Sequence, residues 1–269
     1  MATRAIVTRP AREAAQWVAD LQARGIAACA LPLIAIHPVS DPVLRGALQG
    51  ARERFASYRA VMFVSGNAAQ YFLEQNQALA LIQQAQTAIN TRAWAPGPGT
   101  VAALRQAGLP AGRIDAPLAD AAQFDSEALW QVVAPQIGPG DRVLIVRGGN
   151  TPGAEGGNGR EWLAGQITAA GGAVDFVAAY ERGAPQLDAA QLALARQAAA
   201  DGSVWLLSSS EAVAHLAAAL PGQHWGRARA LATHPRIAQA ARAAGFGSVT
   251  ECRPAFNEVA ASIESPHEH

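Results

Sequence analysis

The sequence predicts an α/β protein with two similar, doubly wound parallel-sheet domains. Near the middle of each half of the chain, at residues 60–72 and 202–216, a short apolar run leads through small hydroxyl or amide residues into an amphipathic helix. A second unit of the same kind follows each one, at residues 92–108 and 229–245. This repeat is longer than any solenoid period and indicates two domains. We expect a ligand cleft between them.

The other segments follow the same scheme in chain order. Strand, helix and extended run succeed one another twice, at residues 5–8, 11–24 and 27–39, and again at 142–146, 160–170 and 173–181. Apolar runs of this length that alternate with helices are typical of parallel sheets covered on both faces. The pattern therefore predicts alternating strands and helices along the whole chain.

Several residues predict where helices begin and end. Asp125 opens the helical pattern that runs to Val133, and Ser65 and Ser208 lie where a strand passes into a helix. Left-handed glycines that end helices are expected at Gly25, Gly108, Gly171 and Gly245. The glycine-rich residues 148–159 predict a flexible loop, and the residues after 263 predict a frayed tail.

Composition excludes several classes of protein. The 269 residues suffice for two domains, and a net charge of zero gives no reason to expect nucleic acid or a membrane as partner. No apolar run is long enough to span a bilayer, and no leader pattern is visible, so we expect a cytoplasmic protein. Cys29 and Cys252 are expected to be free thiols in a reducing compartment.

Motif analysis predicts neither a metal nor a cofactor. All 21 basic residues are arginine, which excludes a Walker phosphate loop and Schiff-base chemistry because both need lysine. The histidines are scattered without ligand spacing. No Gly-x-Ser-x-Gly motif surrounds Ser209, and Gly97-Pro98-Gly99 lacks the third glycine of a dinucleotide fingerprint.

Six predicted strand-to-helix junctions are rich in small or polar residues. They are Thr8-Arg9, Ser65-Gly66-Asn67, Gly97 to Thr100, Arg147-Gly148, Ser208-Ser209-Ser210 and Thr233-His234-Pro235-Arg236. In open α/β sheets such junctions lie at the carboxyl ends of strands, where ligands bind. Helix N-termini there suit carboxylates or phosphates. For any single junction plain helix capping is the favoured explanation, but the repetition of six such junctions favours a polyanionic ligand.

On these residues the chain resembles the uroporphyrinogen-III synthase family over almost its whole length. The resemblance rests on an ordered series: Thr8-Arg9-Pro10, Phe63 to Ala68, Gly97 to Gly108, Ser126 to Leu129, Leu144 to Gly148, Gly159 to Leu163, Gly171 to Arg182 and Leu207 to Val213. It implies two α/β domains joined by a pair of extended segments. One domain would comprise residues 1–38 and 181–269, and the other residues 39–180.

The resemblance implies an enzyme that closes hydroxymethylbilane to uroporphyrinogen III with loss of water and inversion of the last pyrrole ring. The pyrrole nitrogen supplies the electronic push, so no cofactor is implied, and we expect a monomer whose partner is this polycarboxylate tetrapyrrole. The tyrosine that matches Tyr180 would assist departure of the hydroxyl group. The substrate-binding residues would be Arg9, Ser65, Gly66, Asn67, Gly97, Thr100, Arg147, Gly148, Ser208, Ser209, Ser210, Thr233, His234 and Arg236.

One departure from the family keeps alternatives open. Many relatives carry Pro-Thr-Thr where this chain has Pro235-Arg236-Ile237, so Thr233 or His234 would have to supply a hydroxyl or a comparable group. A non-catalytic two-domain binding protein, or a regulatory protein that kept the fold and lost the activity, would share these features. Tyr180 would then be a half-buried hinge residue.

Overall fold

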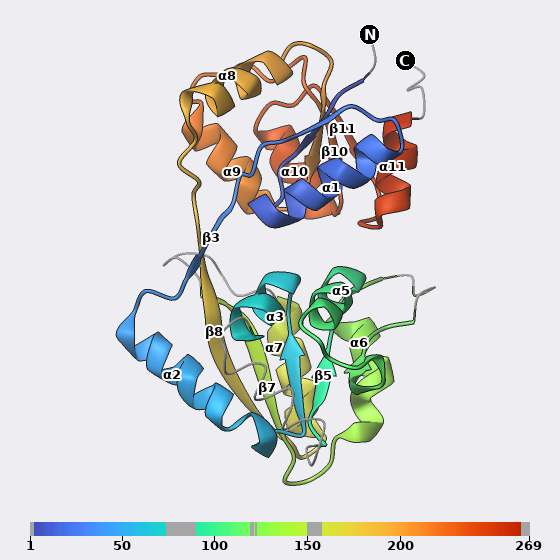
Figure 1. Cartoon of the computed structure of the whole chain (residues 1–269). Helices are drawn as coiled ribbons and strands as arrows, with labels where there is room; N and C mark the ends of the chain where they lie inside the picture. Colours follow the sequence, from blue (N-terminus) through green and yellow to red (C-terminus); the bar gives the residue numbers. More distant parts are fainter. Residues whose placement is uncertain (1–2, 74–89, 119–120, 122, 150–157, 265–269) are drawn as a thin grey trace. The chain divides into compact units, whose positions relative to one another are not determined.

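The structure, a computed structural model, describes residues 3–73, 90–118, 121, 123–149 and 158–264. The chain divides into two compact units (Figure 1), each with its own sheet. Unit 1 comprises Met1–Ala35 and Gly183–His269, and unit 2 comprises Ile36–Arg182. The predicted α/β class with two parallel-sheet regions is confirmed.

Unit 1 contains a five-stranded parallel sheet in the order β11-β10-β9-β1-β2. Its strands are β1 (Ala5–Val7), β2 (Ala28–Ala30), β9 (Val204–Leu207), β10 (Arg229–Ala232) and β11 (Ser248–Glu251). Ala5 of β1 pairs with Val204 on one side and with Ala28 on the other. The N-terminal strand therefore lies inside the sheet of the C-terminal strands, as the family resemblance implied.

Helices cover both faces of this sheet. On one face, α1 (Ala11–Ala23) and α11 (Phe256–Glu264) bury apolar residues against alternate residues of β1 and β9. The other face carries α8 (Ala189–Ala198), α9 (Ser210–Ala219) and α10 (Pro235–Ala243). There Trp205 donates its indole N–H to the carbonyl of Ala198 at 3.2 Å and packs edge-on against Trp225. Neither face of the sheet is left to solvent.

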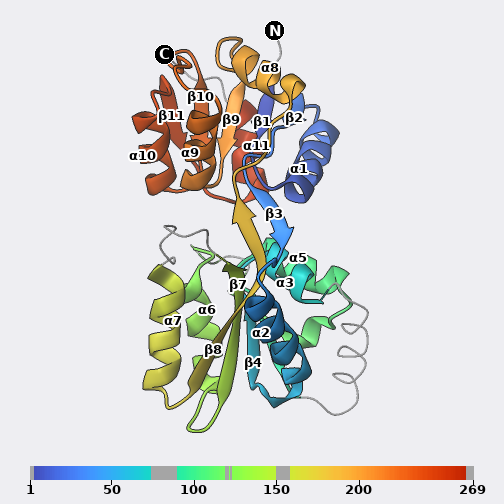
Figure 2. The same ribbon diagram turned by 90° about the vertical axis from the view of Figure 1, so that its left-hand side faces the viewer.

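Unit 2 contains a six-stranded sheet in the order β3-β8-β7-β4-β5-β6. Its strands are β3 (Ala35–Pro38), β4 (Ala60–Phe63), β5 (Arg92–Trp94), β6 (Ile114–Asp115), β7 (Arg142–Gly149) and β8 (Ala173–Gly183). The five strands from β8 to β6 pair in parallel. The edge strand β3 runs in the opposite direction beside β8 (Figure 2).

The helices of unit 2 also form two layers (Figure 2). One apolar cluster joins the sheet to α2 (Pro42–Glu53), α3 (Gly66–Leu73) and α5 (Pro98–Gln106). The other joins it to α6 (Ser126–Val133) and α7 (Asn158–Ala169). Short 3-10 turns at Phe55–Ser57, Ala111–Arg113 and Ala134–Gln136 complete the unit.

The two sheets repeat one arrangement with permuted chain order. In unit 2 the segment β7-α7-β8 comes last along the chain, and β7 pairs with the strand β4 that precedes α3. In unit 1 the corresponding segment β1-α1-β2 comes first, and β1 pairs with the strand β9 that precedes α9. The two halves of the sequence repeat are therefore strands and helices that occupy corresponding positions in the two sheets.

The predicted helix ends agree with the structure except at Ser208. Asp125 accepts a hydrogen bond from the Ala128 N–H at 2.8 Å, and the four predicted glycines have φ between 78° and 93°. Ser65 Oγ accepts from the Ala68 N–H at 3.1 Å. The helix after β9, however, starts at Ser210 with Ser209 as its N-cap. The prediction of Ser208 as the junction residue is therefore one residue early.

Two further predictions need correction. The extended run at 27–39 is split into β2 and β3, which belong to different sheets, and Pro32 between them has no N–H to donate. The predicted loop at 148–159 is too long, because Gly148 and Gly149 continue β7 by pairing with β8. At its other end α7 begins at Asn158, and residues 150–157 lie outside the described residues.

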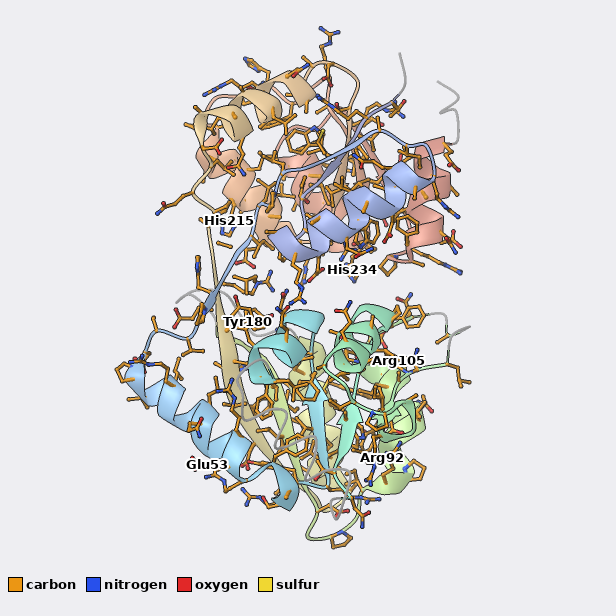
Figure 3. The ribbon with its side chains drawn as sticks, viewed as in Figure 1. Glu53, Arg92, Arg105, Tyr180, His215 and His234 are labelled. Atoms are coloured by element: carbon orange, nitrogen blue, oxygen red, sulfur yellow. The ribbon has the colours of Figure 1, made fainter. Side chains whose placement is uncertain are left out.

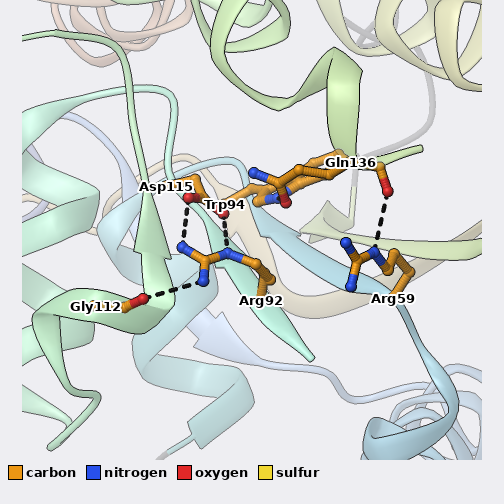
Figure 4. A network of polar contacts seen from close by, with 6 residues as sticks. All are labelled: Arg59, Arg92, Trp94, Gly112, Asp115 and Gln136. Carbon is orange, nitrogen blue, oxygen red and sulfur yellow. Dashed lines mark hydrogen bonds and ion pairs between the residues drawn. The ribbon is translucent and has the colours of Figure 1, made fainter. Parts of the chain in front are cut away.

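A polar network holds the amino edge of the unit 2 sheet, where its parallel strands begin (Figure 4). Arg92 makes two bonds to the Asp115 carboxylate and donates a third to the Gly112 carbonyl at 3.1 Å. Arg59 donates to the backbone carbonyl of Gln136 at 3.0 Å. The hydrogen bond that Arg92 donates to Asp115 raises the pKa of Arg92. These polar groups have structural partners, and they stabilise the edge of the sheet opposite the carboxyl ends of its parallel strands.

Candidate functional site

Each sheet has a switch point, a pair of adjacent strands whose following helices lie on opposite faces. In unit 2 it falls between β7, which leads to α7, and β4, which leads to α3. In unit 1 it falls between β1, which leads to α1, and β9, which leads to α9. Crevices form at the carboxyl ends of strands at such points, and ligands of open α/β sheets bind there.

Tyr180 is brought to the unit 2 switch point by a β-bulge. The β7–β8 register shifts at Arg147/Gly148, so that Arg147 pairs with Ala178 but Gly148 pairs with Tyr180. Ala179 is the extra residue, and a bulge of this kind redirects the side chains that follow it. As a result, the Tyr180 ring lies on the α3 side of the sheet, with its centroid 5.8 Å from that of Tyr71.

The phenol of Tyr180 meets the N-terminus of α3. Its hydroxyl and Ser65 Oγ are 3.2 Å apart, a hydrogen bond in which either group can donate. Ser65 also caps α3, so one side chain positions both the helix and the phenol. Only 4% of Tyr180 is exposed, and Figure 3 shows it at the opposite end of unit 2 from Arg92. The ring is held in one place with its hydroxyl at the carboxyl edge.

A glycine allows the close approach that builds this edge. A Cβ at Gly148 would lie 2.8 Å from Cε2 and Cζ of Tyr180, so only glycine lets the ring pack over β7. A Cβ at Gly66 would make only ordinary van der Waals contact, at 3.4 Å from the carbonyl oxygen of Gly99. Both glycines were predicted as substrate contacts, and the structure gives a packing role to Gly148.

The remaining predicted residues of unit 2 lie along the same edge. Asn67 is half-buried in the first turn of α3. Gly97 is the N-cap of α5, and its carbonyl accepts from the N–H groups of Thr100 and Val101. Thr100 is buried, which makes it a packing residue of α5. The N-termini of α3 and α5 therefore follow neighbouring strands at the same edge as Tyr180.

Arg160 interacts electrostatically with Tyr180 and with two further arginines. Arg147 ends the regular part of β7, Arg182 follows Tyr180 by two residues on β8, and Arg160 lies in the first turn of α7. The pKa of Arg160 is lowered, first by burial and then by the charge of Arg147, while Tyr180 acts in the opposite sense and Arg182 lowers it further. Arg147 also stacks on Phe176, with its Cζ 5.3 Å from the ring centroid.

The unit 1 switch point carries a small hollow at the ends of β1, β9 and β10. It is lined by Arg9, Trp17, Leu206, Leu207, Ser208, Leu231, Thr233, Cys252 and Val259. Thr8 is buried and donates to the Leu206 carbonyl at 2.7 Å, which ties β1 to β9. Arg9 stacks on Trp17 at 4.3 Å from the ring centroid and contacts Glu13 at 3.3 Å. Its guanidinium is therefore held beside the hollow.

The other predicted residues of unit 1 lie at two helix starts. Ser209 and Ser210 begin α9, and Ser209 makes no side-chain capping bond. His234 is the N-cap of α10 (Figure 3), and its Nδ1 accepts the Arg236 N–H at 3.1 Å. His234 and Arg236 are exposed, whereas Ile237 is buried in the core. The residue that replaces a family threonine at position 237 thus serves packing.

Side chains that the sequence analysis missed also reach these two edges. In unit 2 Arg160 interacts electrostatically with Tyr180, and in unit 1 Trp17 and Cys252 line the hollow. Burial, and to a lesser degree Glu258, raises the pKa of the Cys252 thiol, which disfavours a reactive thiolate. An arginine follows the predicted strand at both Arg9 and Arg147, and this recurring position identified them as candidates. Arg160 lies at the start of a predicted helix instead, so the pattern did not identify it.

Within the ranges that the structure describes, no three histidine, cysteine, aspartate or glutamate side chains cluster in a way that could hold a metal ion. No helix among the described residues is both long and apolar enough to cross a bilayer. The chemistry visible at the two edges thus consists of guanidinium groups, hydroxyls, helix N-termini and one phenol, a set suited to a ligand with several carboxylates.

The fold is that of a two-unit α/β protein, and both edges carry groups suited to an anionic ligand. Residues 15–259 match the family model of uroporphyrinogen-III synthase HemD. The chain therefore belongs to the uroporphyrinogen-III synthase family, a family of cyclising lyases of tetrapyrrole biosynthesis.

Two solved structures of uroporphyrinogen-III synthases share the fold. The chain is similar to a mutant uroporphyrinogen III synthase from the extremely thermophilic bacterium Thermus thermophilus, at 17% identity and a TM-score of 0.51, with 98% of this chain and 96% of that one covered. It is also similar to uroporphyrinogen-III synthetase from Helicobacter pylori, at 14% identity and a TM-score of 0.53, with 97% of this chain and 99% of that one covered.

Proposed function

We propose that this protein is a uroporphyrinogen-III synthase, which dehydrates and cyclises hydroxymethylbilane to uroporphyrinogen III. The family match over most of the chain supports this proposal. The structural observation that best supports the reaction is the position of the Tyr180 phenol. It is hydrogen-bonded to Ser65 at the carboxyl edge of unit 2 and interacts electrostatically with Arg160. A phenol can act as a general acid and donate a proton to a departing group.

The reaction needs a leaving group to depart and two rings to meet. The Tyr180 hydroxyl donates to the departing hydroxyl of the substrate, which leaves as water while the pyrrole nitrogen supplies the electrons and gives an azafulvene. The last pyrrole then attacks through its substituted carbon, and the resulting spiro intermediate fragments and recloses with that ring inverted. The protein's task is to orient the rings in favour of this closure over the uncatalysed one.

The protein can orient the pyrrole rings by binding the carboxylates that they carry. We propose that carboxylates bind at the junction residues of each unit, namely at the N-termini of α3 and α5 in unit 2 and at those of α9 and α10 in unit 1. Arg9 and Arg147 contribute charge-assisted hydrogen bonds, and Ser208, Thr233 and His234 add neutral ones. Because Ile237 is buried, we assign the hydroxyl role at that junction to Thr233.

We further propose that the enzyme works as a monomer in the cytoplasm. Cys29 and Cys252 are free thiols, as expected of a compartment that keeps thiols reduced.

The test is an isomer assay. Purified protein is given hydroxymethylbilane, the products are oxidised to porphyrins, and the III and I isomers are separated by chromatography. A synthase yields the III isomer, whereas spontaneous closure yields the I isomer. If the I isomer alone forms at the spontaneous rate, the protein is a binding or regulatory protein of the same fold, and the proposed function is wrong.

A further inference from the structure

Two cations and two aromatic rings contact one another along helix α1 of unit 1. The guanidinium carbon of Arg9 lies 4.3 Å from the centroid of the Trp17 ring, and that ring packs edge-on against Phe256 with the centroids 5.3 Å apart. Phe256 in turn carries the guanidinium of Arg24, whose Cζ is 5.4 Å from the ring centroid. The two rings therefore hold one arginine near each end of α1, Arg9 just before the helix begins and Arg24 as its C-cap.

The local sequence explains why Trp17 reaches Arg9. Glu13 and Trp17 are four residues apart on α1, so they lie on the same face of the helix. Side chains on a helix lean toward its N-terminus, and Arg9 precedes that N-terminus. The guanidinium of Arg9 therefore lies back along α1, over the indole ring and 3.3 Å from a Glu13 carboxylate oxygen.

The two contacts of Arg9 differ in their effect on its charge. Glu13 is partly exposed, and an exposed ion pair contributes little because water screens it. The indole ring attracts the cation through its electron-rich face but carries no negative charge. Trp17 therefore fixes the guanidinium without neutralising it, which a carboxylate in the same place would do.

Arg9 and Arg24 differ in what surrounds the charge that each one presents. Arg9 lines the unit 1 hollow together with Ser208 and Thr233, at the carboxyl ends of the strands. Most of the other residues that line the hollow are apolar, so a charge there is screened less than one on the open surface. Arg24 is exposed at the other end of α1, before β2 begins. The same kind of stack thus holds one arginine at the candidate site and one at the surface.

Resting on the proposed function, we infer that Trp17 is a positioning residue, whose indole face holds the Arg9 guanidinium at the unit 1 hollow where it receives a carboxylate of the substrate. An arginine side chain has a large rotamer entropy, and one that is already held in place loses less of it when the anion binds. Trp17 acts on the reaction through Arg9.

The experiment compares Trp17→Leu and Trp17→Phe with the wild type by steady-state kinetics with hydroxymethylbilane and by thermal unfolding. Trp17→Leu removes the ring face, so KM should rise about 3- to 10-fold, a range that corresponds to one lost cation–π contact. Its kcat should be kept, because the carboxylate is bound equally in the ground state and the transition state. Trp17→Phe retains a ring that attracts cations less strongly, and it should recover part of the loss in KM.

Phe256→Leu is the matched control for packing. It removes the edge-on contact with Trp17 and the stack with Arg24, but neither member of the Arg9–Trp17 pair. Its Tm should fall as that of Trp17→Leu does, because both rings pack against the apolar core of unit 1, whereas its KM should stay at the wild-type value. An equal rise of KM in Phe256→Leu would trace the effect to loosened packing and overturn the inference.

A double-mutant cycle tests whether Trp17 acts through Arg9. Arg9→Gln alone should raise KM about 10-fold or more, the scale of one lost charge-assisted hydrogen bond. Adding Trp17→Leu to it should raise KM no further, whereas independent effects multiply. Multiplied effects, or an unchanged KM in either single variant, overturn the inference. Formation of the III isomer by the wild type keeps these outcomes separate from failure of the proposed function, which would show as the I isomer alone.

Discussion

Replacing Tyr180 with phenylalanine isolates the role of one hydroxyl group. The ring stays, buried at 4% exposure and packed beside Tyr71, and only the hydrogen bond with Ser65 Oγ is lost. Ser65 retains its bond from the Ala68 N–H, so no buried group is left without a partner. A neutral hydrogen bond contributes about 0.5–1.5 kcal/mol. For a chain of this size the Tm should therefore fall by only about 1–6 °C.

The effect on the reaction should be much larger. Without the phenol no proton donor stands at this position for the departing hydroxyl, and we expect the rate to fall about 10- to 1000-fold, toward the scale of a lost general acid. The assay is single-turnover cyclisation, quenched and oxidised, with the III-to-I isomer ratio measured by chromatography. The ratio should shift toward isomer I as spontaneous closure competes with the slower enzyme.

Tyr58→Phe is the matched control. Tyr58 is also buried in unit 2, and its hydroxyl donates to Asp175 at 2.9 Å near the start of β8, away from the carboxyl edge. This variant should lose a similar amount of stability and keep its rate. An unchanged rate in Tyr180→Phe would show that the phenol only packs there. Equal rate losses in both variants would trace the effect to the stability of the unit.

Three further outcomes are expected. Gly148→Ala places a Cβ 2.8 Å from the Tyr180 ring, so calorimetry should show a loss of about 1–3 kcal/mol, with a rate at least 10-fold lower. Ser40 donates to Glu181 and lowers its pKa below 4.5; the Tm deficit of Ser40→Ala should be present at pH 7 and fade as the pH falls through that lowered pKa. A fragment of residues 36–182 should unfold cooperatively in denaturant.

The sequence alone determined the features that depend on neighbouring residues. Alternating apolar runs and helical patterns predicted the α/β class, because burial on both faces of a parallel sheet needs continuous apolar strands. Asp125 predicted the start of α6, and Gly171 predicted the end of α7, because capping and left-handed backbone are local properties. Ser65 was found for the same reason: a hydroxyl at a strand-to-helix junction caps the helix that follows.

Tertiary structure alone decided which of these groups meet. No pattern along the chain showed that one extra residue in β8 turns the Tyr180 ring over Gly148, because a bulge is a property of the pairing between two strands. Nor did the sequence indicate that Arg160 interacts with the charges of Arg147 and Arg182, because repulsion between charges depends on distance in space and on burial. Residue types predicted the kind of ligand, and the pairing of β7 with β8 decided where the Tyr180 phenol lies.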